Sequence, residues 1–95
     1  MATVNITVVF FGPLKEQTGE KTARFDLPQG STYGDLLDQI GDRFGRLLHK
    51  KIWDNRENAF KAGILAVGKG RDLDSRDTVL EADEEIKIIP LLAGG

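Results

Sequence analysis

The last two residues, Gly94 and Gly95, are the strongest candidates for chemistry in this 95-residue sequence. They end the segment PLLAGG, which starts at Pro90 directly after the strand-like run EEIKII. Five residues beyond Pro90 reach roughly 16 Å when extended, and their side chains shrink from leucine to none. Glycine also adopts backbone angles that other residues cannot. The pattern predicts an arm that enters a narrow tunnel, with the carboxylate of Gly95 as the reacting group.

Such an arm needs a second protein. Ordering it costs about 1–2 kcal/mol per residue, which a partner must offset with main-chain hydrogen bonds and with Leu91 and Leu92 as anchors. A carboxylate is a poor electrophile until it is activated, for example as an acyl adenylate, which sulfur or an amine can attack. The chain has no cysteine, which excludes thiolate catalysis and disulfides, and it has one histidine, His49. We therefore expect another protein to carry out the chemistry on this chain.

Two other motifs are better explained as turns. VGKGR (residues 67–71) lacks the glycine spacing and the following helix of a phosphate-binding loop, so it predicts a hairpin turn. The acidic segment of residues 81–85 lacks the alternation with glycine of a calcium loop, so it predicts a solvated turn. We predict no metal site and no bound cofactor.

Composition points to one folded domain. Apolar residues make up 40% and charged residues 29% of the chain, and the net charge is −2 with the two signs interspersed. This balance argues against a nucleic acid or a membrane as partner, because both usually require a basic face. The N-terminal apolar run has no basic region before it, so it predicts a strand rather than a signal peptide, and a cytoplasmic protein. We predict a domain over residues 1–90 and a flexible tail over 91–95.

Alternating apolar residues predict strands at both ends of the chain. The strand Thr3–Phe11 turns its even-numbered residues, from Val4 to Phe10, toward a core. A loop centred on Gly19 leads to a second strand, Lys21–Leu27, which completes a hairpin. The last strand, Glu85–Pro90, is too apolar for a sheet edge and is expected beside the first.

The middle of the chain predicts one main helix and a second hairpin. Helical spacing of apolar residues runs through residues 28–48, from Leu36 to Leu48, with Ser31 or Thr32 as the N-cap. Two alternatives stay open at Gly41 and Gly45, which either allow close packing or end the helix early. Residues 49–63 have no clean period and predict an irregular segment, pinned to the core by Trp53 and Phe60. ILAVGKGRDL (residues 64–73) predicts a strand, a turn and a short strand. One helix on a mixed sheet, with parallel first and last strands, is an α+β fold of the β-grasp type.

The side of the sheet away from the helix carries apolar residues. Strand parity turns Val9, Phe11 and Ile89 outward, and Leu73 is expected to join them. A small monomer seldom exposes a contiguous apolar patch without a use for it. Two interpretations follow: the patch binds a partner, or the segment IWDNRENAF (residues 52–60) covers it.

Several segments together resemble a known family. VVFFGPLKEQTG, FDLPQGSTYGDLLDQI, ILAVGKGRDL and DTVLEADEEIKIIPLLAGG are similar to the small sulfur carriers of the ubiquitin-like β-grasp class. This family includes the molybdopterin synthase small subunits and the thiamine-pathway sulfur carriers. The chain has Ala82-Asp83 in the acidic turn, where the family usually has Gly-Asp.

The resemblance implies a mechanism. An ATP-dependent activating enzyme adenylates Gly95, a sulfur donor protein converts the adenylate to a thiocarboxylate, and the arm delivers the sulfur inside a synthase. In the molybdenum branch the acceptor is a pterin precursor and the partner is the catalytic large subunit. The family's partner-binding positions fall on Phe11, Leu73 and Ile89. On this account the chain is not an enzyme by itself.

The residues leave other functions open. The chain could carry sulfur in the thiamine pathway or in another pathway. It could instead be a protein modifier whose activated tail is captured by a lysine amine. A plain interaction domain with an inert tail is the third possibility.

Overall fold

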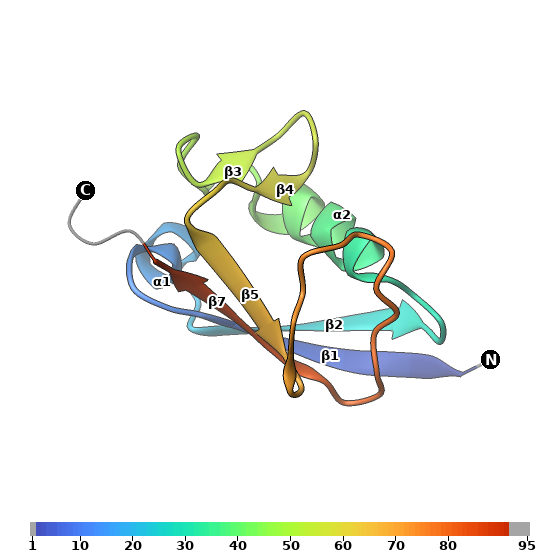
Figure 1. The fold of residues 1–95 in the computed structure, drawn as a ribbon. Coiled ribbons are helices and arrows are strands. Elements are labelled where there is room, and N and C mark those ends of the chain that lie inside the picture. Colours follow the sequence, from blue (N-terminus) through green and yellow to red (C-terminus); the bar gives the residue numbers. More distant parts are fainter. Residues whose placement is uncertain (1, 92–95) are drawn as a thin grey trace.

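A computed structural model describes residues 2–91, which form two helices, a five-stranded sheet and a two-stranded sheet (Figure 1). The elements in chain order are β1 (Thr3–Phe10), α1 (Pro13–Thr18), β2 (Thr22–Pro28), α2 (Tyr33–Phe44), β3 (Trp53–Asp54), β4 (Ala59–Phe60), β5 (Ile64–Gly68), β6 (Arg71–Asp72) and β7 (Glu85–Pro90). The predicted division into a domain of residues 1–90 and a tail of 91–95 stays a prediction.

The large sheet has the strand order β2-β1-β7-β5-β6. β1 pairs with β2 in antiparallel fashion and with β7 in parallel, with Val8 opposite Ile86. β5 is antiparallel to β7, with Ala66 opposite Ile88. The last strand therefore lies at the centre of a mixed sheet and parallel to the first, which confirms the predicted β-grasp fold.

The core lies between the sheet and α2. Alternate residues of three strands are buried there, as the pattern predicted: Val4, Ile6, Val8, Phe10, Ala23, Phe25, Leu27, Ile86 and Ile88. The ring of Phe44 at the end of α2 meets the ring of Phe10 edge to face, with centroids 5.4 Å apart. Burial of this one sheet face against the helix provides the main apolar driving force for folding.

The N-terminus of α2 has a reciprocal cap. The Oγ1 atom of Thr32 accepts a hydrogen bond from Asp35 N (3.3 Å), and Asp35 Oδ2 accepts one from Thr32 N (2.9 Å). Thr32, not Ser31, is therefore the N-cap. The helix ends at Phe44 with Gly45 as its C-cap, which is the early end that the sequence left open, and Leu47 beyond it is 52% exposed.

Two segments differ from the prediction. The expected loop before Gly19 contains α1, which starts with Pro13 and ends at Gly19 in the left-handed conformation (φ 77°). The expected irregular segment contains the β3–β4 hairpin. Trp53 is 1% exposed and meets the ring of Phe60 edge to face at 4.8 Å, so the prediction that these two residues pin the segment is confirmed.

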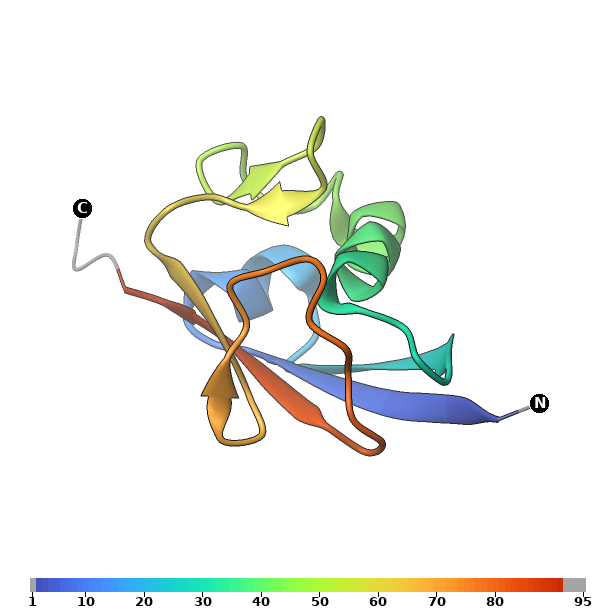
Figure 2. The ribbon, with the colours of Figure 1, turned by 45° about the vertical axis from the view of Figure 1, so that its right-hand side comes forward.

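The hairpin β3–β4 and α2 lie on the same side of the large sheet in both views (Figures 1 and 2). Asn58, between β3 and β4, donates a hydrogen bond to Asp38 of α2 (3.3 Å). Neither α2 nor this hairpin therefore covers the other side of the sheet. Within residues 2–91, no helix is long and apolar enough to cross a membrane.

Candidate functional site

The root of the C-terminal arm is fixed in the middle of the sheet. Pro90, the last residue of β7, lies opposite Ile64 of β5. Leu91 N then donates a hydrogen bond to the carbonyl oxygen of Gly63 (2.6 Å), while the Leu91 side chain is 61% exposed. The arm therefore starts from a rigid position. Leu92, Gly94 and Gly95 lie outside the described residues, and their predicted roles stay predictions.

An apolar surface lies on the open side of the sheet, next to this root. Its members are half-buried or exposed and come from β1, the residue after β1, β5 and β7: Val9, Phe11, Leu65, Val67 and Ile89. We call this surface the outer face. The register places Leu65 opposite Ile89, and it places the exposed Lys87 on the same side of the sheet, between Val9 and Val67. Phe11 is 38% exposed. The structure thus places Phe11 and Ile89 where strand parity predicted.

The prediction that Leu73 belongs to this surface is wrong. Leu73 is 5% exposed and belongs to the core. The turn at Lys69–Gly70 pairs Gly68 with Arg71, and Leu73 N donates to the carbonyl oxygen of Ala66 (2.8 Å). Leu73 is therefore opposite Ala66, whose side chain faces the core, and it shares that face.

The hairpin of residues 52–60 does not cover the outer face. It packs on α2 instead, where Gly41 leaves space for the ring of Trp53 and the amide of Asn58. A Cβ atom at Gly41 would lie 2.6 Å from Asn58 Oδ1 and 3.1 Å from the Trp53 ring. The interpretation that this segment covers the patch is therefore wrong.

The sequence reasoning missed two residues of the outer face, Leu65 and Val67. Both alternate with the buried Ala66 in ILAVG, so strand parity on β5 would have found them. Together with Ile89 they make the outer face continuous from β5 to β7.

A buried carboxylate holds the turn that leads into β7. Glu84 has no exposed surface, contrary to the solvated turn that was predicted. Its Oε1 accepts hydrogen bonds from Arg71 Nη2 (2.8 Å) and Glu81 N (2.9 Å). Its Oε2 accepts from Lys69 N (2.9 Å) and Arg71 Nε (3.2 Å). Burial by itself raises the pKa of Glu84, but the hydrogen bonds from Arg71, Glu81 and Lys69 outweigh it and hold the pKa below its ordinary value.

The sequence of the chain matches the model of one protein family. The model of the ThiS family matches residues 8–95, which include β1 from Val8 onward, the outer face and the arm. The chain belongs to the ThiS family. This ThiS family chain is 36% identical over 93 residues to a molybdopterin synthase sulfur carrier subunit of Drosophila erecta, with 97% of this chain and 92% of the relative covered.

Solved structures support the fold of this ThiS family chain. SAMP1 from Haloferax volcanii superposes with a TM-score of 0.78 at 22% identity, with 96% of this chain and 99% of that chain covered. A chain in the crystal structure of the BexX/CysO complex of Amycolatopsis orientalis superposes with a TM-score of 0.65 at 20% identity, covering 95% and 99% of the two chains. Both have the same fold at low identity.

The described part of this ThiS family chain provides a platform for the arm. Across residues 2–91, no group of three His, Cys, Asp or Glu side chains is placed to hold a metal ion. The Nδ1 atom of His49 accepts a hydrogen bond from Lys51 N (3.1 Å), a local contact within its own turn. The features that can serve chemistry are the fixed root at Leu91 and the outer face beside it.

Proposed function

We propose that this chain is the sulfur carrier subunit of a molybdopterin synthase. The observation that carries the proposal is the arm root: β7 runs through the centre of the sheet and ends at Pro90 beside an uncovered apolar surface. The relative from Drosophila erecta, which matches over nearly the whole of both chains, supports the same function. The chain contributes the sulfur, and a catalytic large subunit contributes the active site.

The proposed chemistry takes place at the carboxylate of Gly95. A carboxylate oxygen attacks the α-phosphorus of ATP in an activating enzyme, which forms an acyl adenylate and releases pyrophosphate. The sulfur of a donor protein's persulfide then attacks the carbonyl carbon and AMP leaves. A thiol reduces the resulting acyl disulfide, which leaves a thiocarboxylate. ATP is consumed by the activating enzyme and is not a cofactor of this chain.

The outer face would bind the proteins that receive the arm. Burial of apolar area contributes roughly 25 cal/mol per Å², and half-exposed residues such as Phe11 and Ile89 have area left to bury. A fixed root lowers the cost of binding further, because only the residues after Leu91 must be ordered. The fixed root and the outer face together direct the arm to one place on a partner.

Reconstitution tests this function. The thiocarboxylated chain is mixed with a molybdopterin synthase large subunit and the pterin precursor, and the products are analysed by mass spectrometry. We expect a sulfur-containing pterin and return of the chain to its carboxylate form. If the thiocarboxylate survives this mixture, but is consumed in a thiazole-forming reaction or appears as lysine-linked conjugates in extract, the proposal is wrong. A chain without Gly95 is the matched control and should transfer no sulfur.

A further inference from the structure

One charged side chain interrupts the outer face. Lys87 of β7 lies between Val9 of β1 and Val67 of β5, and all three side chains are on the open side of the sheet. Ile89, two residues further along β7, has the same orientation. Three outward neighbours of Lys87 are therefore apolar, and the fourth is Glu85, two residues before it. The chain thus places an ammonium group among residues that otherwise suit an apolar contact.

The chain itself does little to hold this ammonium group. Lys87 Nζ is 4.0 Å from Glu85 Oε1, which is too long for a hydrogen bond. The two side chains are 50% and 57% exposed, and ion pairs exposed to this extent contribute little to stability. The N–H donors of Lys87 are therefore available to a second protein.

A partner that binds the outer face must cover Lys87. A strand rises about 3.3 Å per residue, which places Lys87 about 7 Å from Ile89 and about 13 Å from Leu91 at the arm root. An interface of ordinary size covers roughly 800 Å² on each partner, which corresponds to a disc of about 16 Å radius. Lys87 therefore lies well inside any such interface that is centred on Ile89.

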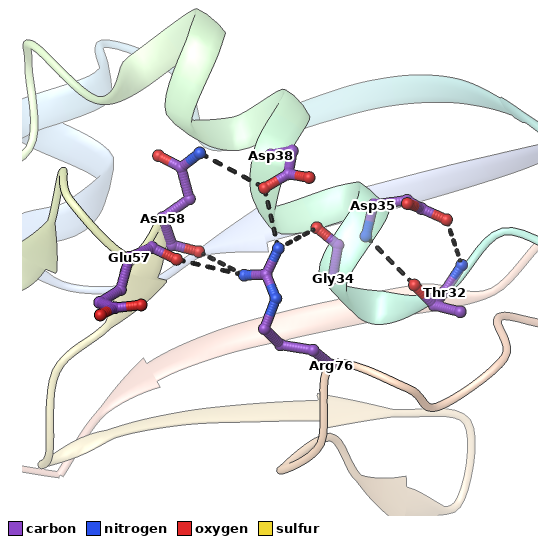
Figure 3. Close-up of polar contacts among 7 residues, drawn as sticks. All are labelled: Thr32, Gly34, Asp35, Asp38, Glu57, Asn58 and Arg76. Atoms are coloured by element: carbon purple, nitrogen blue, oxygen red, sulfur yellow. Dashed lines mark hydrogen bonds and ion pairs between the residues drawn. The ribbon is translucent and has the colours of Figure 1, made fainter.

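The other side of the sheet is covered by the chain's own elements. Arg76 Nη1 donates to the carbonyl oxygens of Glu57 (3.3 Å) and Asn58 (2.9 Å) in the hairpin (Figure 3). Its Nη2 atom donates to Gly34 O (3.1 Å) and Asp38 Oδ1 (2.8 Å) of α2. These contacts hold the hairpin and the loop of Arg76 against α2. A partner that receives the arm and packs on the sheet therefore meets the outer face.

Burial against a partner makes Lys87 unfavourable unless the partner supplies a negative charge. A buried charge without an opposite charge is costly, and the attraction between an ammonium group and a carboxylate is stronger there than in water. Glu85 does not meet this need, because its 4.0 Å contact is weak and it lies opposite Thr7, at the polar boundary of the outer face. The complementary surface therefore requires an acid of its own.

We propose that Lys87 sets the partner specificity of the outer face by binding a carboxylate side chain of the synthase large subunit. This carboxylate reaches the sheet between Val9 and Val67. The apolar residues supply the buried area, and the ion pair selects among surfaces that are equally apolar. A surface without an acid at this point leaves the ammonium group buried and unpaired, and is rejected. The inference rests on the proposed function, because it names a contact in the complex with the large subunit.

Three substitutions of Lys87 test the contact, with binding of the large subunit measured by titration calorimetry. Lys87→Met keeps an unbranched stem without the charge and should weaken binding by about tenfold or more. Lys87→Glu should weaken it by about a hundredfold or more, and Lys87→Arg should stay within about threefold of the wild type. Lys50→Met, at an exposed lysine in the turn before β3, removes the same charge elsewhere and should bind like the wild type.

The direction of the Lys87→Met effect decides the question. If the large subunit supplies no carboxylate, methionine enlarges the apolar surface and removes a charge that binding must desolvate. Lys87→Met then binds as tightly as the wild type or more tightly, and the inference is wrong. Circular dichroism establishes that each variant is folded.

Cross-linking of the wild-type complex identifies the partner group without any variant. A water-soluble carbodiimide joins an amine and a carboxylate that are in contact through an amide bond, with loss of one water. Peptide mapping should show Lys87 joined to an aspartate or glutamate of the large subunit. A link from Lys87 to Glu85 alone would contradict the inference.

The outcomes separate this inference from the proposed function. If the wild type binds the large subunit and delivers its sulfur while Lys87→Met binds equally well, the role of Lys87 is wrong and the function stands. If the wild-type chain does not bind the large subunit, the proposed function is wrong and the inference fails with it.

Discussion

Replacement of Glu84 by glutamine should destabilise the fold more than any other single isosteric change in the acidic turn. Each carboxylate oxygen of Glu84 accepts two hydrogen bonds. A glutamine keeps one oxygen, but its amide nitrogen must face two donors. The variant therefore loses two hydrogen bonds and leaves the charge of Arg71 without its buried partner.

The magnitude follows from burial. Each lost hydrogen bond to a charged group costs about 1.5–3 kcal/mol, so the loss of two costs at least about 3 kcal/mol, although Arg71 is 30% exposed and keeps Glu81 at 3.9 Å. In a domain of this size, each kcal/mol lowers the melting temperature by roughly 4–8 °C, so we expect a loss of at least about 12 °C. Glu81→Gln is the matched control: its carboxylate is 55% exposed and 3.9 Å from Arg71. That change should cost less than about 1 kcal/mol.

The pH dependence gives the prediction a second readout. The folded-state pKa of Glu84 is depressed below its ordinary value of 4.5. Its charge therefore contributes stability that is present above pH 4.5 and is lost as the pH falls through the depressed value. Urea unfolding followed by circular dichroism should show the full difference between wild type and Glu84→Gln at pH 7, and a shrinking difference below pH 4.5. A Glu84→Gln cost as small as that of Glu81→Gln would refute the reasoning.

Two further predictions concern the outer face and the acidic turn. Ile89→Asp should weaken binding of the large subunit by about tenfold or more and leave the chain folded, whereas Ile88→Asp, on the buried side of β7, should unfold it. Titration calorimetry measures the binding and thermal melts measure the folding. If Ile89→Asp is unfolded, the assignment of Ile89 to the outer face is wrong. Asp83→Gly should raise the free energy of unfolding by about 0.5 kcal/mol, because Asp83 has a left-handed backbone (φ 58°) that glycine adopts without strain. Asp77 does not have a left-handed backbone, so Asp77→Gly should lower the free energy of unfolding. If urea melts show the same change for Asp83→Gly and Asp77→Gly, the explanation is wrong.

Local pattern was sufficient for the long elements. Alternation in β1, β2 and β7 predicted their extents to within one residue and their buried faces, and the central position of β7 followed from its apolar content. The capped start of α2 could also be predicted, because the cap depends on residues three apart. The end of α2 could not be predicted from the sequence, since glycines at positions 41 and 45 are compatible with either a continued or a broken helix.

The remaining differences depend on contacts that local pattern does not contain. α1 has six residues, Pro13–Thr18, and both Pro13 and the Gly19 that follows it are turn signals as well as helix ends. Glu84 looks like any other acid of its turn, and only the approach of Arg71, 13 residues away, makes its burial favourable. The position of Leu73 was predictable in principle, because the two-residue turn at Lys69–Gly70 sets its register with Ala66.

The most direct test of the account is the intact mass of the chain after incubation with its activating enzyme, ATP and a persulfide donor. The account predicts a gain that corresponds to the exchange of one oxygen for one sulfur, located at Gly95 by fragmentation and absent when Gly95 is deleted. No change in mass, or the same gain without Gly95, would contradict it.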